Sequence, residues 1–267
     1  MRSPSVSSVA LFRINGVTVT APNMDMAVRQ VVNKFNIEKS FYICTLNLDH
    51  LVKLEADDEF RRVYNAAELV TADGFPIVYL ARREGVNLTR TTGADLVEPL
   101  CAAAAEQDVS VFFVGTTEST LRACMGALLA KWPTLRIVGA VSPSFCFDPA
   151  GPEAREICDQ ITASGAKLCF VGLGAPKQEI FSAMAVMRVS GVAFIPIGAA
   201  LEYIAKTKMR APAWVQYVGC EWLWRLAAEP RRLTPRYFKS AVLLARIYFR
   251  KTYSVVYSEK LLDPPLG

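Results

Sequence analysis

Apolar residues along this chain gather in short, nearly continuous runs, and longer amphipathic segments lie between them. Six runs predict strands, at residues 41–45, 68–72, 110–115, 136–141, 167–172 and 192–198. Apolar residues at helical spacing fill most of the intervals, for example at 24–35, 92–107 and 120–132. Strands that are apolar throughout are typical of a parallel sheet covered by helices on both faces. The pattern therefore predicts an α/β fold with a mostly parallel sheet.

Two segments outside this alternation have patterns of their own. Near the N-terminus, apolar and polar residues alternate on either side of Asn15-Gly16, so a β-hairpin is expected there. From residue 209 onward, tryptophans, tyrosines and arginines are interleaved with aliphatic residues, and we expect Pro230 and Pro235 to divide this stretch into shorter helices. Its segment 239–251 is basic, aromatic and too short to cross a bilayer, which suits a helix lying in the membrane interface.

Composition and charge add further constraints. The 267 residues are 52% apolar and 21% charged, which suits one sizeable globular domain or a domain with an appendage. No apolar run is long enough for a membrane-spanning helix or a signal peptide. The seven cysteines are scattered, so we expect reduced core residues of a cytosolic protein. Residues 1–202 carry a net charge of −3 and residues 203–267 carry +8, so the basic tail is expected to meet an anionic partner.

Ligands of open α/β sheets bind outside the carboxyl ends of the strands, and four predicted strand ends carry unusual residues. They are "TLNLDH" after the first strand, "TADG" after the second, Gly115-Thr116-Thr117 after the third, and "GLGAPKQE" at 172–179. None is a G-x-G-x-x-G loop or a P-loop, so neither kind of nucleotide site is predicted. In the last loop, Gly172 and Gly174 would allow close backbone approach, while Lys177 and Gln178 offer donors to a sugar or diphosphate. The loop alone is equally compatible with a purely conformational turn.

Asp73, in "TADG", has two interpretations. A carboxylate just past a buried strand can project into a cleft and act as a general base. The alternative is a turn aspartate that caps the helix beginning near Pro76, which is the commoner role of an Asp-Gly pair.

Thr45, Asn47 and His50 form a second polar cluster at a strand end. His50 is the only histidine, so any histidine-based mechanism would use it and a multi-histidine metal site is excluded. A lone histidine is more often a hydrogen-bonded structural residue. The sequence also has no Asp-x-Asp pair, so we predict no metal site. A departing diphosphate would then need arginine, lysine or a helix N-terminus to stabilise its charge.

Taken together, the motifs are more specific than any one of them. T-x-N-x-x-H (45–50), A-D-G (72–74), R-x-x-G-x-D (90–95), G-x-G-x-P-K-Q-E (172–179) and "RAPAW…G-x-EW-x-x-R…EP-x-R" (210–232) occur in this order and spacing. The chain thereby resembles the WecG/TagA/CpsF family of bacterial glycosyltransferases over about residues 10–250. The resemblance implies a Rossmann-like core and an inverting, metal-independent transfer from a UDP-sugar. The donor sugar would be N-acetylmannosamine, its uronic acid or glucose, and the acceptor a sugar on undecaprenyl diphosphate, in the synthesis of exopolysaccharide or a cell-wall polymer.

The resemblance also implies roles for residues. Asp73 would be the catalytic base, with Thr45 and Asn47 in the same pocket. Substrate-binding residues would be Gly115, Gly172, Gly174, Lys177, Gln178, Glu179, Arg90 and Asp95. In the C-terminal segment, Arg225, Arg232 and Arg236 would stabilise the UDP leaving group; they fall on one face if that segment is a single helix.

These inferences define the expected organisation. Residues 1–205 would form the catalytic core, and residues 206–267 a basic, aromatic, helical appendage that closes the active site and contacts the cytoplasmic face of the inner membrane. No cofactor or nucleic-acid partner is expected. An apolar surface where the tail docks would favour homo-oligomers, as dimers in solution, and monomers on the membrane. Two alternatives are a non-catalytic UDP-sugar-binding, membrane-peripheral module of a polysaccharide assembly complex and, ranked last, a nucleic-acid-binding protein that uses the basic tail.

Overall fold

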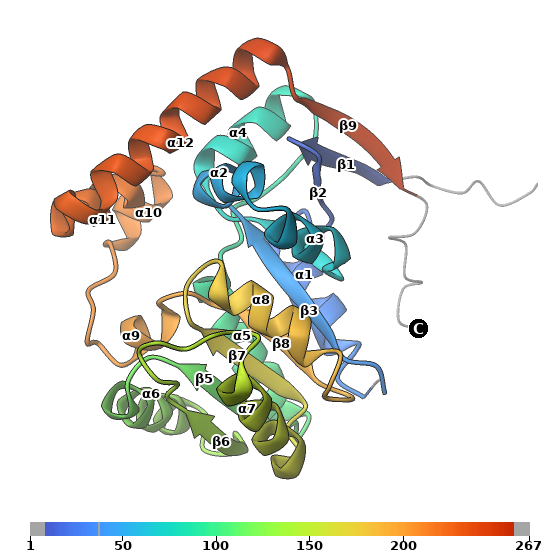
Figure 1. Cartoon of the computed structure of the whole chain (residues 1–267), viewed down its shortest axis with the longest axis vertical. Coiled ribbons are helices and arrows are strands. Elements are labelled where there is room, and N and C mark those ends of the chain that lie inside the picture. Colours follow the sequence, from blue (N-terminus) through green and yellow to red (C-terminus); the bar gives the residue numbers. More distant parts are fainter. Residues whose placement is uncertain (1–8, 37, 259–267) are drawn as a thin grey trace, which may run out of the picture.

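A six-stranded parallel sheet lies at the centre of the computed structural model, which describes residues 9–36 and 38–258 (Figure 1). The strands pair in the order β4-β3-β8-β7-β5-β6, and each pair is parallel. They are β3 (Phe41–Leu46), β4 (Leu69–Ala72), β5 (Val111–Gly115), β6 (Ile137–Val141), β7 (Leu168–Gly172) and β8 (Ala193–Pro196). All six predicted strands are confirmed, as is the α/β fold class.

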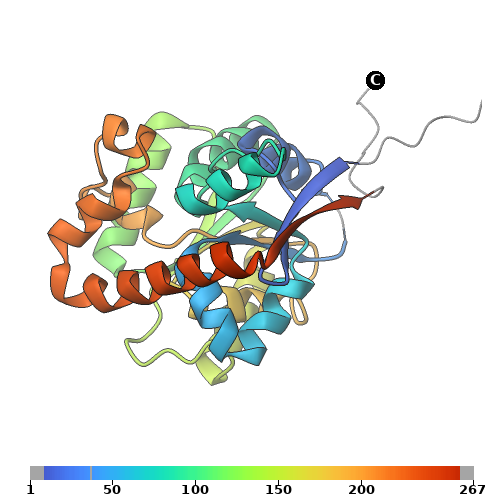
Figure 2. The same cartoon turned by 90° about the horizontal axis from the view of Figure 1, so that it is seen from above.

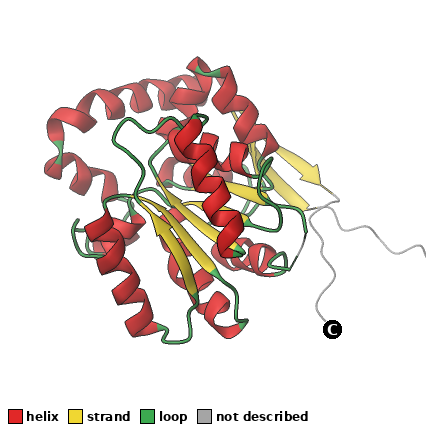
Figure 3. Cartoon of the chain, turned by 60° about the horizontal axis from the view of Figure 1, so that its bottom comes forward, coloured by secondary structure: helices red, strands yellow, loops and turns green. Residues whose placement is uncertain are grey.

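Helices cover both faces of this sheet (Figure 3) because successive strand residues point to opposite sides. In β3, Cys44 packs into one apolar core and Ile43 into the other. The first core is completed by α2 (Leu48–Ala56), α3 (Asp58–Ala66), α4 (Phe75–Arg83), α7 (Pro152–Ser164) and α8 (Lys177–Ala185). The second is completed by α1 (Met24–Val32), α5 (Gly93–Glu106), α6 (Glu118–Lys131) and α9 (Ala200–Ile204).

The predicted N-terminal hairpin is confirmed, and it has an unpredicted third strand. β1 (Val9–Ile14) and β2 (Val17–Val19) are antiparallel, and Asn15 and Gly16 between them have φ values of 50° and 85°, as a two-residue hairpin turn requires. β9 (Tyr253–Ser258) pairs antiparallel with β1 along its whole length. The two ends of the described chain therefore meet in one small sheet, and the segment after residue 206 is not entirely helical.

Three helices, α10 (Ala213–Tyr217), α11 (Glu221–Ala228) and α12 (Pro230–Arg250), precede β9. In Figure 2, α12 runs along the outside of the body and leads into β9. Pro230 begins α12, as expected, but the prediction that Pro235 divides the stretch is wrong because Pro235 lies inside α12. Pro235 and Arg231 are both exposed, so water can satisfy the Arg231 carbonyl that Pro235 leaves unpaired. Burial of Leu243 and Ile247 holds the helix together.

Two helical glycines offer a matched test of how closely α5 approaches the sheet. A methyl group at Gly93, the first residue of α5, would overlap the Pro196 carbonyl oxygen and lie 2.9 Å from the Ile197 Cα atom. Both obstacles are backbone, so Gly93→Ala should lower the free energy of unfolding by about 1–3 kcal/mol. Gly126, exposed in α6, has nothing within 4 Å of such a methyl group. Gly126→Ala should therefore raise the free energy of unfolding by about 0.5–1 kcal/mol. Urea unfolding measures both, and a Gly93→Ala midpoint at or above wild type would contradict the packing described.

Candidate active site

The carboxyl ends of β3, β4, β7 and β8 surround a cleft of about 520 Å³, to which α11 and α12 also contribute side chains. The lining holds six cations, Lys53, Lys208, Arg210, Arg225, Arg232 and Arg236. It holds three carboxylates, Asp73, Glu202 and Glu221. This excess of positive charge suits a ligand that carries negative charge, such as a diphosphate.

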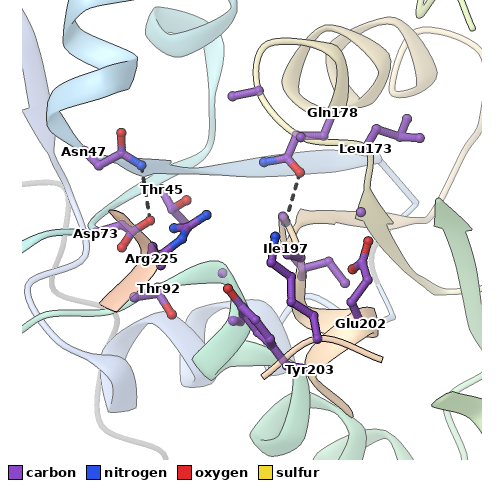
Figure 4. Close-up of a pocket in the computed structure, with 18 of the residues that line it drawn as sticks. Thr45, Asn47, Asp73, Thr92, Leu173, Gln178, Ile197, Glu202, Tyr203 and Arg225 are labelled. Atoms are coloured by element: carbon purple, nitrogen blue, oxygen red, sulfur yellow. Dashed lines mark hydrogen bonds between the residues drawn. The ribbon is translucent and has the colours of Figure 1, made fainter. Parts of the chain in front are cut away.

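Asp73 lies directly after β4, and its backbone N–H donates to the Leu46 carbonyl oxygen at 2.7 Å. Gly74, with φ of 141°, is the N-cap of α4, and no side chain caps that helix. The capping interpretation of Asp73 is therefore wrong. Its carboxylate instead accepts a hydrogen bond from the Asn47 side-chain amide at 3.3 Å and faces the cleft (Figure 4).

Asn47 holds this carboxylate because it is itself fixed at the start of α2. The Asn47 side-chain oxygen accepts from the His50 backbone N–H at 3.0 Å and caps the helix. The amide nitrogen is thereby turned toward Asp73. One residue thus performs two functions, capping a helix and orienting a carboxylate.

Burial is the main reason that the pKa of Asp73 is raised to about 6. The Asn47 hydrogen bond, Arg90 and Arg225 act in the opposite direction, and Glu221 adds to the increase. An aspartate with this pKa is still ionised at neutral pH and holds a proton more strongly than an ordinary aspartate. Both properties are those of a general base.

Arg225 lies beside Asp73 in Figure 4. Within the described residues, its guanidinium makes no hydrogen bond or ion pair, whereas Arg232 pairs with Glu229 and Arg236 with Asp49 at 2.6 Å. The three arginines do not share one helix, because α11, which carries Arg225, ends before α12 begins at Pro230. They nevertheless all reach the cleft.

The loop after β7 brings Gly172, Gly174 and Gln178 to the opposite wall. Gln178 accepts from the Gly198 backbone N–H at 3.0 Å through its side-chain oxygen and donates to Glu179 at 2.8 Å. Glu179 is fully buried, and burial raises its pKa to about 7. The orientation of the Gln178 amide is therefore fixed, and its second N–H is the group left for a ligand.

Thr45 is buried at the end of β3 and lines the cleft beside Asn47. Five residues expected to bind substrate lie outside the lining. Gly115 packs against the Gly172 carbonyl, Lys177 is exposed at the start of α8, and Glu179 stands behind Gln178. Arg90 and Asp95 are engaged in ion pairs.

His50 fits the structural interpretation. It is 4% exposed, and its Nδ1 shares a hydrogen bond of 2.6 Å with the Tyr64 hydroxyl. Burial lowers its pKa to about 3, so the ring is neutral at physiological pH. The expectation that the cysteines are core residues is confirmed for five of the seven, which are buried, while Cys220 is half-buried and Cys146 exposed.

Several cleft residues were not predicted. Glu202 and Tyr203 follow β8, so the rule that directed attention to strand ends could have found them. Arg210 and Glu221 lie within the C-terminal motifs, but nothing in those motifs separates them from their neighbours. Thr92, Lys53 and Lys208 carry no sequence signal.

Two kinds of feature are absent from the described residues. No cluster of three or more His, Cys, Asp or Glu side chains there could hold a metal ion. No helix in that part of the chain is both long and apolar enough to cross a bilayer.

Among known protein families, the one described as the Glycosyl transferase WecG/TagA/CpsF family matches residues 12–255. The match covers the parallel sheet, α10 to α12 and every cleft residue named above. The chain belongs to the WecG/TagA/CpsF family of glycosyltransferases.

Proposed function

We propose that the protein transfers a sugar from a UDP-sugar to a sugar on undecaprenyl diphosphate, with inversion and without a metal ion, during polysaccharide synthesis. The observation that carries this proposal is the Asp73 carboxylate, oriented by Asn47 in a cationic cleft beside the unpaired Arg225. Family membership supports the reaction class. N-acetylmannosamine, its uronic acid and glucose all remain candidates for the donor sugar.

In the proposed reaction, Asp73 takes the proton of the acceptor hydroxyl as that oxygen bonds to the anomeric carbon of the donor. The bond from this carbon to the diphosphate oxygen breaks, and UDP leaves with the electron pair. Attack from the face opposite UDP gives a β-product from an α-linked donor. The raised pKa of Asp73 makes it a stronger base for this transfer.

The leaving diphosphate gains charge as its bond to the sugar breaks, and positioned cations lower the energy of that transition state. We assign this role to Arg225, Arg232 and Arg236, which line the cleft from α11 and α12. Arg225 needs to release no partner before it binds phosphate oxygen. Gln178 would donate its free N–H to a sugar or phosphate oxygen on the opposite wall.

We further propose that residues 206–267 form an appendage that contacts the cytoplasmic face of the membrane. Exposed large apolar residues are concentrated there: Trp214, Tyr217, Trp222, Leu223, Phe238, Val242, Tyr248 and Phe249. Exposed cations lie among them, including Arg231, Lys239 and Arg250. This combination suits an anionic lipid surface.

The direct test is UDP release in chelator, with a panel of UDP-sugars and a lipid-diphosphate-linked monosaccharide acceptor. Release should require both substrates and should fall about 10²–10⁴-fold in Asp73→Asn, the range for loss of a general base. Asp159→Asn, an exposed aspartate in α7, is the matched control and should retain activity. Full activity in Asp73→Asn would remove the base assignment. Stabilisation by UDP-sugars without turnover would favour the non-catalytic binding module.

The pKa of Asp73 predicts a pH profile. Because the base must be ionised, kcat/KM should increase about tenfold per pH unit below about 6 and level off above it. Initial rates between pH 4.5 and 8.5 measure this. A kcat/KM that is already nearly constant from about pH 5 upward would show that the titrating group is an ordinary carboxylate.

The same pKa has a consequence for stability. The folded protein binds the Asp73 proton more tightly than the unfolded chain, whose aspartate pKa is about 3.9. The resulting stabilisation is fully present below about pH 4 and is lost as the pH rises through about 6. Asp73→Asn cannot ionise, so its Tm relative to wild type should be higher at pH 8 than at pH 4. A pH-independent difference would contradict the raised pKa.

Membrane contact is tested by sedimentation with vesicles that contain anionic lipid. Trp214 and Tyr217 are 70% and 92% exposed, so replacing both with serine should weaken vesicle binding about tenfold or more without destabilising the fold. Phe145→Ser is the control, since Phe145 is fully exposed but lies outside the appendage. Equal losses in the two variants would show that exposed aromatic residues act non-specifically.

A further inference from the structure

Four charged side chains form a chain of alternating sign at the edge of the cleft, and two of them, Arg210 and Glu221, also line it. Glu221 pairs with Arg90 at 3.1 Å, Arg90 with Asp95 at 3.6 Å, and Asp95 with Arg210 at 2.5 Å. All four are between 18% and 26% exposed, so solvent screens them only in part. Arg90 and Asp95 belong to the R-x-x-G-x-D motif, and Arg210 and Glu221 to the C-terminal motifs. The proposed reaction gives these four residues no role. We call these four residues the charge network.

The two inner members are fixed to the body of the protein. Arg90 lies between Thr89, whose N–H donates to the Pro22 carbonyl at 2.9 Å, and Thr91, whose N–H donates to the Ala72 carbonyl at 2.8 Å. Asp95 is in the first turn of α5, where its backbone N–H donates to the Thr92 hydroxyl at 3.1 Å. Ala72 immediately precedes Asp73, so the network is anchored next to the proposed base.

The two outer members belong to the segment that carries Arg225. Arg210 lies just before α10, and Glu221 is the first residue of α11. Arg225 follows Glu221 by four residues, which is about one helical turn. The position of Glu221 therefore sets the position of Arg225.

Apolar burial does not fix α11 in the same way. None of its residues is buried, and Trp222 and Leu223 are 47% and 46% exposed. The turn before it, at Gly219, lies against Phe75, which is itself half exposed. By contrast, α12 buries Leu243 and Ile247 against the body.

We propose that the charge network positions Arg225 beside Asp73, so that Arg90, Asp95, Arg210 and Glu221 are positioning residues and not substrate ligands. Two cations and two carboxylates neutralise one another in the network, so Arg210, although it lines the cleft, adds no net positive charge for a diphosphate. What the network fixes is a short helix that has no fully buried residue. The catalytic consequence rests on the proposed role of Arg225, whereas the structural consequence does not.

Hydrogen exchange on the unliganded protein tests the structural consequence. Arg90→Gln should accelerate amide exchange in α11 about tenfold and leave α12 unchanged, because α12 has its own buried residues. Arg90 is the informative member, since Glu221→Gln also removes a charge that favours the helix N-terminus. Amide exchange in α11 should be only slightly faster in the Arg90→Gln/Glu221→Gln double variant than in Glu221→Gln alone, because Arg90 acts on α11 through its contact with Glu221.

Arg246→Gln is the matched control, since it breaks an ion pair with Glu55 that lies outside the cleft lining. It should leave exchange in α11 and activity unchanged. Unchanged α11 exchange in Arg90→Gln, or equal acceleration in α11 and α12, would overturn the proposal.

Kinetics separate positioning from binding. Displacing Arg225 removes stabilisation of charge that develops as the donor bond breaks, so Arg90→Gln should lower kcat about tenfold and change the donor KM less than twofold. A raised KM with unchanged exchange would instead make Arg90 a substrate ligand. If the wild-type protein releases no UDP from any donor, the proposed function fails, and the exchange measurement still decides whether the network holds α11.

Discussion

Parallel pairing is the constraint on which the arrangement of the cleft depends. Strands that run in one direction place all their carboxyl ends at one edge, so β3, β4, β7 and β8 bring residues as distant in sequence as Thr45 and Gly198 into one cleft. The chain must turn away sharply at that edge. Gly74 and Gly198 turn it with positive φ values, and Gly115 approaches the backbone of Gly172 too closely for a side chain. The turns therefore leave backbone and short polar groups facing the cleft.

A division of charge between the two parts of the chain completes the site. The body carries −3 and supplies Asp73, whereas residues 203–267 carry +8 and supply four arginines and one lysine of the lining. A nearby opposite charge commonly lowers a carboxyl pKa by about 1–3 units, yet that of Asp73 is raised to about 6 because burial outweighs the cations. The site can therefore hold positive charge for a diphosphate without removing the basicity of the carboxylate. The ion pairs of Arg232 with Glu229 and of Arg236 with Asp49 offset part of the positive charge that would otherwise lower the pKa of Asp73.

The features that could be predicted from the sequence are those set by residues close together in the chain, namely strands and tight turns. Six apolar runs became the six central strands, and Asn15-Gly16 became the hairpin turn. Asp73 could be placed at a strand end, but a helix cap is the commoner role of an Asp-Gly pair, and only the Gly74 N-cap and the contact with Asn47 separate the two interpretations. Strand β9 escaped prediction because its partner β1 lies about 240 residues earlier in the chain, a separation that no local pattern encodes. Local patterns could not predict the ion-pair partners of Arg90 and Asp95, since these partners come from α11 and from the segment before α10.

The cations of the cleft differ in how firmly the fold holds them. Arg232 and Arg236 lie at the start of α12, a helix that spans 21 residues, packs on α2 and continues into a strand paired with β1. Moving them would disturb a buried apolar seam. Arg225 lies on a helix of eight residues that has no fully buried side chain and whose Trp222 packs against Tyr237 of α12, so displacing this helix costs less apolar burial than displacing α12 and depends more on the Glu221–Arg90 ion pair. Of the three arginines from the C-terminal helices, Arg225 is therefore the one whose position depends on the ion pair of a neighbouring residue, whereas the positions of Arg232 and Arg236 are set by the packing of α12.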